Sequence, residues 1–258
     1  MKKLIALVLG VVMMLSMAAC GAEKTDLEYV KDKGTLVVGI TDFAPMDYKE
    51  DGEWIGFDAD MAKAFAKELG VEVEFVEIDW DNKAMELSGK TIDCVWNGMT
   101  LTDEVKSAMD CSNPYCNNAQ VVVVKKDVAD KYQTKDSLKE LKFAVEAGSA
   151  GEAEVEALGL EYTSVKAQSD ALLEVKSGTS DAAVIDLLMA GAMIGEGTGY
   201  ADLTYTIGLN SEEYGVGFRK GSNMVEKFNE FMKKAYEDGS MMECAKKYGV
   251  HESIVEQK

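Results

Sequence analysis

The residues best suited to bind a small polar molecule occur in the stretch WNGMTLTDE, at residues 96–104. Asn97 and Gly98 follow a short apolar strand, and Thr100 comes before a helix that is predicted to begin at Thr102. In an α/β sheet, the carboxyl end of a strand exposes backbone amides and hydroxyl groups to a ligand. The stretch therefore predicts one wall of a binding site. An ordinary strand-to-helix turn capped by threonine would show the same pattern.

A carboxylate occupies a similar position later in the chain. Asp186 directly follows the apolar residues 182–185, so we expect it at the ligand-binding end of a strand. An unpaired buried carboxylate is costly, and a cationic group on a ligand would relieve that cost. The alternative is that Asp186 caps the helix predicted to follow, and the two roles are compatible.

Three aromatic residues lie near these polar positions. Trp80 stands in the polar segment IDWDN, where stacking or a cation-π contact with a ligand is one role and simple packing is the other. Trp96 is next to the turn at Gly98 and could line the site or fill the core. Phe43 lies in a long loop that also needs aromatic anchors to fold.

Composition excludes several classes of function. The chain has 27 basic and 46 acidic residues, a net charge of −19, which disfavours nucleic acid and anionic lipid headgroups as partners. The only histidine is His251, and the sequence contains no Ser-His-Asp or Cys-His set, phosphate loop or metal-ligand cluster. We therefore expect a protein that is not an enzyme and that uses neither a cofactor nor a metal.

Residues 1–20 have the pattern of an export signal, with Lys2 and Lys3 before an apolar run and the ending MAAC. This ending resembles a bacterial lipobox, which implies cleavage before Cys20 and lipid attachment to it. The protein would then be extracytoplasmic and anchored to the cell membrane by lipid. The alternative is ordinary signal-peptide cleavage after Ala19.

Export also makes disulfide bonds possible. Cys111 and Cys116 are the nearest pair in sequence, and whether they are bridged stays open. Cys94 lies in an apolar strand and Cys244 on a predicted helix, where free cysteine behaves as a small hydrophobic residue.

The predicted elements divide the chain into two similar halves. Strand, helix, strand, helix and strand follow one another over residues 36–96, and this order recurs over residues 142–185. The alternation predicts two α/β lobes with mainly parallel sheets. We expect the strands at 202–207 and 214–218 to return to the first lobe, so that two crossings form a hinge beside a ligand cleft. The predicted division is 27–124 with 214–258 in lobe 1, and 125–213 in lobe 2.

Several segments in a common order resemble the family 3 extracellular solute-binding proteins, the polar amino-acid receptors of ABC importers. These segments are GTLVVGITDFAPM, GFDADMAKAFAKELGVEVEFVEIDW, IDCVWNGMTLTDE, SNPY, VEAGSAGE, SDAAVIDLLMA and EEYGVGF. The resemblance implies the type II periplasmic binding protein fold, in which two Rossmann-like lobes close over a small molecule. It also implies a monomer that docks on an ABC permease.

The family's contact positions can be carried over to this sequence. They imply that an aromatic ring stacks on the ligand, that the turn after the first-lobe strand meets an ammonium group, and that a helix N-terminus meets a carboxylate. The positions are Asp42, Phe43, Trp80, Gly98, Thr100, Ser149, Ala150 and Asp186, with Trp96, Asn97 and Glu146 as further candidates.

One departure from the family pattern bears on the ligand. The family usually places an arginine where this chain has Val105, and that arginine clamps the α-carboxylate of the ligand. The only arginine here is Arg219, which we expect in a surface turn. The candidate lining is instead acidic, with Asp42, Glu146 and Asp186.

Two ligand classes remain open on this basis. The ligand is either an amino acid held by Ser149 and neighbouring amides, or a mainly cationic molecule without an α-carboxylate. Two other functions also stay open, a sensor that presents its ligand to a receptor and a lyase on the same fold.

Overall fold

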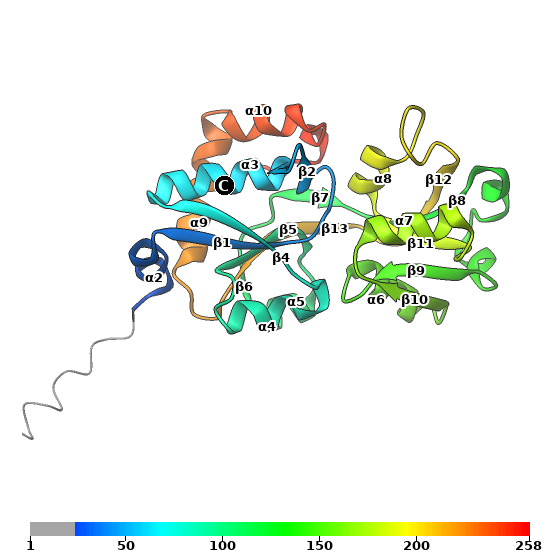
Figure 1. Cartoon of the computed structure of the whole chain (residues 1–258), viewed down its shortest axis with the longest axis horizontal. Helices are drawn as coiled ribbons and strands as arrows, with labels where there is room; N and C mark the ends of the chain where they lie inside the picture. The colour runs from blue at the N-terminus through cyan, green and yellow to red at the C-terminus, as the bar shows by residue number, and fades with distance from the viewer. Residues whose placement is uncertain (1–23) are drawn as a thin grey trace, which may run out of the picture.

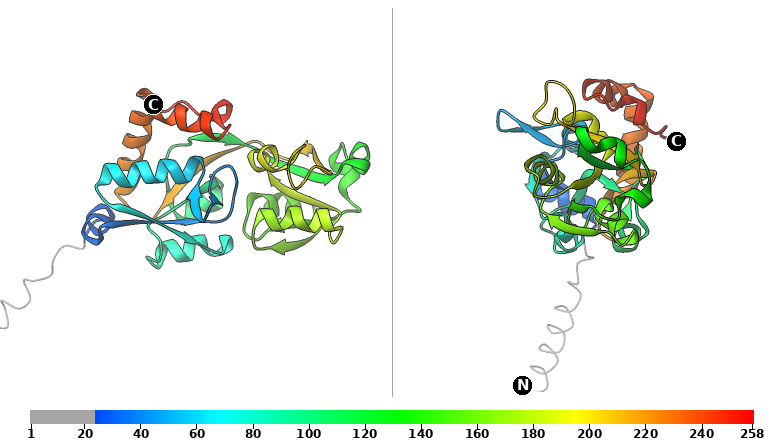
Figure 2. Two further views of the ribbon diagram at one scale, coloured as in Figure 1. Left: turned by 45° about the horizontal axis from the view of Figure 1, so that its top comes forward. Right: turned by 90° about the vertical axis from the view of Figure 1, so that its right-hand side faces the viewer.

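The structure, a computed structural model, describes residues 24–258 as two α/β lobes that lie end to end (Figures 1 and 2). The predicted signal segment and Cys20 lie outside these residues. Within residues 24–258, no helix has the length and apolar character needed to cross a membrane.

The first lobe is built on a sheet with the order β4-β1-β5-β13-β6, and β7 also pairs with β13. Strand β1 is parallel to β4 and β5, whereas β13 runs antiparallel to β5. The strands are β1 (Thr35–Ile40), β4 (Glu72–Glu77), β5 (Cys94–Thr100), β6 (Asp110–Cys111), β7 (Cys116–Asn118) and β13 (Glu212–Phe218), with a separate hairpin of β2 (Tyr48–Glu50) and β3 (Glu53–Ile55). The helices are α2 (Asp26–Lys33), α3 (Phe57–Leu69), α4 (Lys83–Ser88), α5 (Asp103–Ala108), α9 (Met224–Glu237) and α10 (Ser240–Lys247), with 3-10 turns η1 (Trp80–Asn82) and η4 (His251–Ser253).

Helix α3 shows how the apolar pattern builds this lobe. Met61, Phe65 and Leu69 recur at helical spacing, and all three are buried. Each fully buried side chain of this size contributes roughly 1.5–3 kcal/mol. The helix ends where Gly70 adopts the left-handed conformation, as its sequence predicts.

The second lobe is built on a sheet with the order β10-β9-β11-β8-β12. Strand β9 is parallel to β10 and β11, whereas β8 is antiparallel to β11 and β12. The strands are β8 (Gln120–Lys125), β9 (Lys142–Glu146), β10 (Glu161–Val165), β11 (Ala182–Asp186) and β12 (Leu203–Gly208). The helices are α6 (Ala150–Ala157), α7 (Gln168–Ser177) and α8 (Leu187–Met193), with 3-10 turns η2 (Lys126–Lys131) and η3 (Lys135–Leu138).

The sheets correct the predicted boundaries of the lobes. Strand β8 belongs to the second sheet, so the predicted end of lobe 1 at residue 124 is wrong. Strand β12 also stays in the second sheet, and only β13 returns to the first. The chain therefore crosses near Ala119 and again at residues 209–211, where the backbone amide of Leu209 donates to the Gln120 carbonyl at 2.8 Å. A run of valines can be buried in either sheet. The sequence therefore did not show which strands β8 pairs with.

The side chain of Arg219 also lies elsewhere than predicted. Its side chain is 9 % exposed, and its guanidinium pairs with Asp26 at 2.9 Å and with Asp93 at 3.3 Å. Its side chain thus joins helix α2 and the start of β5 to the end of β13. The Arg219 carbonyl accepts from the Ser222 amide at 3.0 Å, so the predicted turn is present, but the guanidinium is buried and not at the surface.

Cys94, Cys111, Cys116 and Cys244 are all free. On strand β13, Cys111 lies opposite Gly217 and Cys116 lies opposite Tyr214, so their partners are three residues apart.

Candidate functional site

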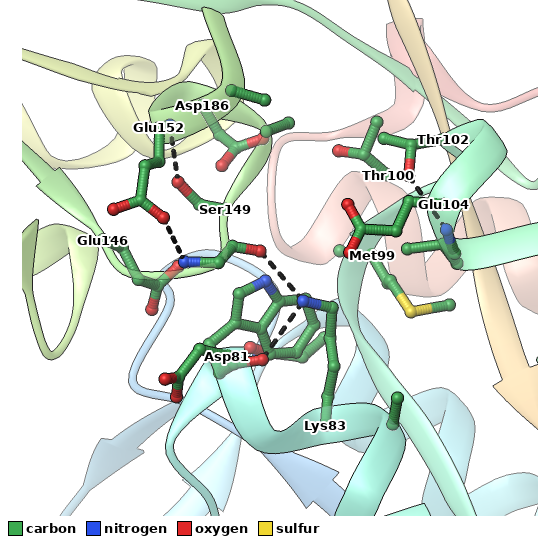
Figure 3. A pocket seen from close by; sticks show the side chains of 18 of the residues that line it. Asp81, Lys83, Met99, Thr100, Thr102, Glu104, Glu146, Ser149, Glu152 and Asp186 are labelled. Carbon is green, nitrogen blue, oxygen red and sulfur yellow. Dashed lines mark hydrogen bonds between the residues drawn. The ribbon is translucent and has the colours of Figure 1, made fainter. Parts of the chain in front are cut away.

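A cavity of about 500 Å³ lies between the two lobes, and both lobes line it (Figure 3). Most of the predicted binding residues meet there, although they come from distant parts of the sequence. They are Phe43, Trp80, Asn97, Gly98, Thr100, Glu146, Ser149, Ala150 and Asp186.

The end of β5 forms one wall, and its geometry depends on Asn97. The Asn97 amide oxygen accepts hydrogen bonds from the Thr41 backbone and hydroxyl groups at 2.9 and 2.8 Å. Its amide nitrogen donates to the Asp47 carboxylate at 2.8 Å and to the Thr41 carbonyl at 3.1 Å. Asn97 therefore fixes the loop after β1 against the end of β5.

Gly98 allows an aromatic ring to approach this wall closely. The φ angle of Gly98 is +53°, and a Cβ atom there would lie 2.5 Å from the ring of Phe43. Any larger side chain would displace Phe43 from the cavity. The Gly98 amide is held by the Asp58 carboxylate at 2.7 Å.

Trp80 lies in the turn that follows β4. It begins the 3-10 turn η1 and is 7 % exposed. The ammonium group of Lys83 lies 4.9 Å from the centre of its ring, which is within the range of a cation-π contact. The ring therefore lies beside a cation on the cavity wall.

The opposite wall begins at the N-terminus of α6. The Ser149 hydroxyl accepts from the Glu152 amide at 3.1 Å, and the Glu152 carboxylate accepts from the Gly148 amide at 2.7 Å (Figure 3). These two bonds shape the turn between β9 and α6. Ser149 thus caps α6, so its hydroxyl is already engaged within its own lobe.

Asp186 lies at the end of β11, where donors from both lobes surround it. Its Oδ1 atom accepts from the Tyr214 hydroxyl at 2.6 Å and from the Gln120 amide at 3.0 Å. The side-chain amides of Asn118 and Gln168 also donate to it. Burial, and then the charge of Glu212, raise the pKa of Asp186 to about 8. Asp186 is the N-cap residue of helix α8, as the alternative from sequence held, but its carboxylate makes no capping hydrogen bond to that helix.

Glu146, at the end of β9, is a second buried carboxyl group. It is 2 % exposed, and its Oε1 atom has no hydrogen-bond partner within the described range. Burial, followed by the charge of Asp186, raises the pKa of Glu146 to about 8. A cation placed beside it would favour the ionised form.

Two of the candidate residues lie outside the cavity. Asp42 is exposed and does not contribute to the lining. Trp96 is completely buried in the first lobe, where its ring is 4.8 Å from that of Phe228. Trp96 packs in the same core cluster as Cys94, on one side of β5, whereas Val95 and Met99 pack on the other side.

Several lining residues were missed by sequence reasoning. Lys83 is the first residue of α4, and Gln120 and Gln168 begin β8 and α7. A polar residue at the start of an otherwise apolar strand was a usable signal for Gln120. Lys83 has the sequence context of any exposed residue in a short helix, so no signal set it apart.

The two lobes also touch directly beside the cavity. Lys83 donates to the Gly148 carbonyl at 2.9 Å, and Lys166 pairs with Asp79 at 3.3 Å. Gly148 packs so closely on Asp81 that a Cβ atom would lie 2.6 Å from the Asp81 Cα atom. The lobes are therefore in direct contact near Trp80, and Asp81, Lys83 and Gly148 of this contact also line one edge of the cavity.

Comparison with known proteins gives a consistent set of relatives. The bacterial extracellular solute-binding proteins, family 3, match residues 36–251. The chain is 32 % identical to the arginine-binding extracellular protein ArtP of Bacillus subtilis (strain 168), over 96 % of this chain and 98 % of that protein. A mutant ArgBP from T. maritima has a TM-score of 0.82 at 33 % identity, covering 87 % of this chain and 99 % of its own. A substrate-binding protein of an ABC uptake transporter from Streptococcus pneumoniae, solved with bound histidine, has a TM-score of 0.80 at 31 % identity, covering 88 % and 97 %.

Proposed function

We propose, since this chain belongs to the bacterial extracellular solute-binding proteins of family 3, that it captures an amino acid between its lobes and delivers it to an ABC permease. The observation that carries this proposal is the cavity between the lobes, where Trp80 of one lobe and Asp186 of the other both form the lining. A pocket of this size, lined by apolar side chains and by many polar ones, suits a ligand as small and polar as an amino acid.

The ammonium group of the amino acid would lie beside Asp186. That carboxyl group is buried and its pKa is raised, so a positive charge from the ligand would stabilise its ionised form. Gly98 and Thr100 face the same cavity and offer a carbonyl and a hydroxyl group to the ammonium. The rings of Phe43 and Trp80 would pack against the rest of the ligand.

The carboxylate of the amino acid would lie toward the start of α6. The backbone amides at Ser149 and Ala150 are at the positive end of the helix dipole, and that of Ser149 also donates to the Glu146 carbonyl at 3.2 Å. The relatives described as binding arginine or histidine support an amino acid as the ligand. They also support a binding protein over the lyase considered from the sequence.

Closure of the lobes follows from a ligand that touches both. An open form and a closed form differ in free energy, and the ligand favours the closed form only because its contacts to the two lobes exist together there. Asn118, Gln120 and Tyr214 lie on the strands that flank the crossings, and all three donate to Asp186. A positive group of the ligand that pairs with Asp186 would therefore lie next to the two chain crossings that form the hinge.

We further propose that the protein is extracytoplasmic and held at the cell membrane by lipid on Cys20. The acidic surface argues for a tether, because it would not bind anionic headgroups by itself. Radiolabelled palmitate should enter the protein in growing cells and should be absent from the Cys20→Ala variant. Equal labelling of the two proteins would exclude lipid on this residue.

A thermal-shift screen tests the proposed binding function. The purified protein is heated with each of the common amino acids, with linear polyamines and with short peptides. A ligand that binds only the folded state raises the melting temperature. At least one amino acid should raise it. A rise with polyamines or peptides and none with any amino acid would refute the proposal.

A further inference from the structure

The buried charges of the cavity do not balance. Glu146 and Asp186 are the two buried acidic residues in the lining, whereas the other acidic groups there are exposed at the rim or half-buried. Lys83 is the one basic residue of the lining within residues 24–258. A ligand that completes this site would bring more positive than negative charge.

Lys83 does not neutralise either buried acid. Its ammonium group donates to the carbonyl oxygens of Gly148 at 2.9 Å and of Trp80 at 3.1 Å (Figure 3). Across the part of the chain that the structure describes, no carboxylate lies within salt-bridge distance of it. A lysine ammonium has three N–H donors, so one is left for a ligand.

Among the described residues, the first-lobe wall offers no other cation for a carboxylate. Val105 occupies the place of the family's usual arginine, and Met99, Ala108 and Met109 line the cavity near it. Lys83 projects from α4 toward the second lobe, between Glu146 on one side and Met99 on the other (Figure 3). Its cationic group is thus inside the cavity, although it comes from another helix.

Glu146 requires a different partner. Its Oε1 atom is buried without a hydrogen bond in the described structure, and such an atom costs free energy until a donor meets it. Gln168 and Gln120 are occupied with Asp186, and the two hydrogen bonds of Lys83 in the described structure go to carbonyl groups and not to Glu146. A second positive group on the ligand would satisfy this atom.

We propose that Lys83 binds the carboxylate of the ligand in place of the absent arginine, and that Glu146 binds a cationic side chain, so that the ligand is a basic amino acid. This inference rests on the proposed function and names its substrate class. The α-ammonium group is on Asp186, the side-chain cation on Glu146 and the carboxylate on Lys83. Each charge of the ligand then has one opposite charge in the cavity.

A competing account makes Lys83 only a latch between the lobes. Its bond to the Gly148 carbonyl would then hold the lobes together whatever the ligand carries. Loss of a latch would weaken all ligands by the same factor. Loss of a carboxylate partner would weaken only ligands that have a free carboxylate, so the two accounts differ in selectivity.

The test compares L-arginine with L-arginine methyl ester by isothermal titration calorimetry. The ester keeps both cationic groups and lacks the carboxylate charge. The wild-type protein should bind L-arginine about ten- to a hundredfold more tightly than the ester, which is the range for a hydrogen bond between charged groups. In Lys83→Met, the affinity for L-arginine should fall by about that factor and the affinity for the ester should change less than threefold.

Lys166→Met is the matched control. Lys166 also bridges the lobes, through Asp79, but it does not line the cavity. Its loss should leave the ratio of the two affinities unchanged. Lys83→Arg keeps the charge and should keep the preference for the free carboxylate, and it serves as the second variant if Lys83→Met does not fold.

Each outcome decides the inference. Equal weakening of L-arginine and its ester in Lys83→Met would make Lys83 a latch and overturn the proposal. Binding of neutral or acidic amino acids, with none of L-arginine, L-lysine, L-ornithine or L-histidine, would also overturn it while leaving the proposed function standing. Failure of every amino acid in the thermal-shift screen would instead remove the proposed function itself.

Discussion

Charged side chains form a balanced group at the base of the first lobe and an unbalanced group in the cavity between the lobes. At the base, the Arg219 guanidinium meets the carboxylates of Asp26 and Asp93, and Lys33 lies 2.6 Å from Asp93. Arg219 also donates to the Ile92 carbonyl at 2.7 Å. Two cations thus face two carboxylates, and the group is neutral.

In the cavity, the partners of the buried acids are neutral. Asp186 accepts from Asn118, Gln120, Gln168 and Tyr214, and within the described residues it has no basic partner at salt-bridge distance. Glu146 keeps one oxygen without a partner in this same range. The base is complete within the chain, whereas the cavity lacks positive charge. The comparison indicates that the charges at the base stabilise the fold. The buried acids of the cavity would be neutralised by a cation on a bound ligand.

The largest effect should come from breaking the balanced group. Arg219→Ala leaves Asp93 buried without its guanidinium partner, so the free energy of unfolding should fall by about 3–5 kcal/mol. Urea unfolding followed by circular dichroism measures it. Arg219→Lys keeps the charge without the planar fork and should lose less. An unchanged urea midpoint for Arg219→Ala would show that the charged group at the base does not stabilise the folded state.

Removing a charge from the cavity should act on binding and not on folding. Asp186→Asn keeps the shape of the side chain and removes the charge that faces the ligand ammonium, so affinity for the amino acid should fall by about a hundredfold. The free energy of unfolding of the empty protein should change little near pH 7, because Asp186 with a pKa of about 8 already holds its proton there and the amide is neutral too. Calorimetry and urea unfolding measure the two quantities.

Asp42→Asn provides the control for this variant. Asp42 was predicted at the site but is exposed and outside the lining. The affinity of the Asp42→Asn variant for the amino acid should stay within twofold of the wild type. Unchanged binding in Asp186→Asn, or an equal loss in Asp42→Asn, would contradict the assignment of Asp186 to the ligand.

The dependence of stability on pH sharpens the same contrast. The pKa of Glu146 is about 8 in the folded protein and 4.5 ordinarily, so between these values the folded state holds a proton that the unfolded state has lost. The free energy of unfolding of the wild type should therefore decrease as pH rises through this window, by at most about 1.4 kcal/mol per unit for this group.

Glu146→Gln should remove this part of the pH dependence. The variant should gain stability relative to the wild type as pH rises from about 5 to about 8. Glu156→Gln, at an exposed position on the rim, should follow the wild-type curve. Parallel curves for Glu146→Gln and the wild type would mean that Glu146 is ionised in the empty cavity.

Local pattern was enough to predict the fold class and much of the cavity. Apolar spacing predicted α3, and the ends of apolar strands located Gly98 and Asp186, because the carboxyl ends of parallel strands meet at one edge. The first hinge boundary was wrong, because residues 121–124 are valines that suit the interior of either lobe. Only the pairing of β8 with β11 decides between the two sheets.

Charge pairing was the part that sequence could not supply. Arg219 meets Asp26 and Asp93 across more than a hundred residues, and nothing near it in the chain marks it as buried. Lys83 enters the cavity because a 3-10 turn places the start of α4 there. Both outcomes depend on which elements meet in space, and single-sequence patterns do not carry that information.

The smallest effect should come from restoring the arginine of the family. Val105 is 7 % exposed and lines the cavity, so Val105→Arg would bring a planar donor to the carboxylate. With Lys83 already present, affinity for L-arginine should rise by less than about tenfold. In the Lys83→Met background the same change should give a larger gain, because no other cation then meets the carboxylate. Val105→Met lengthens the side chain without a charge and should give no gain in either background. An equal gain for L-arginine and its methyl ester would show that position 105 does not face the carboxylate.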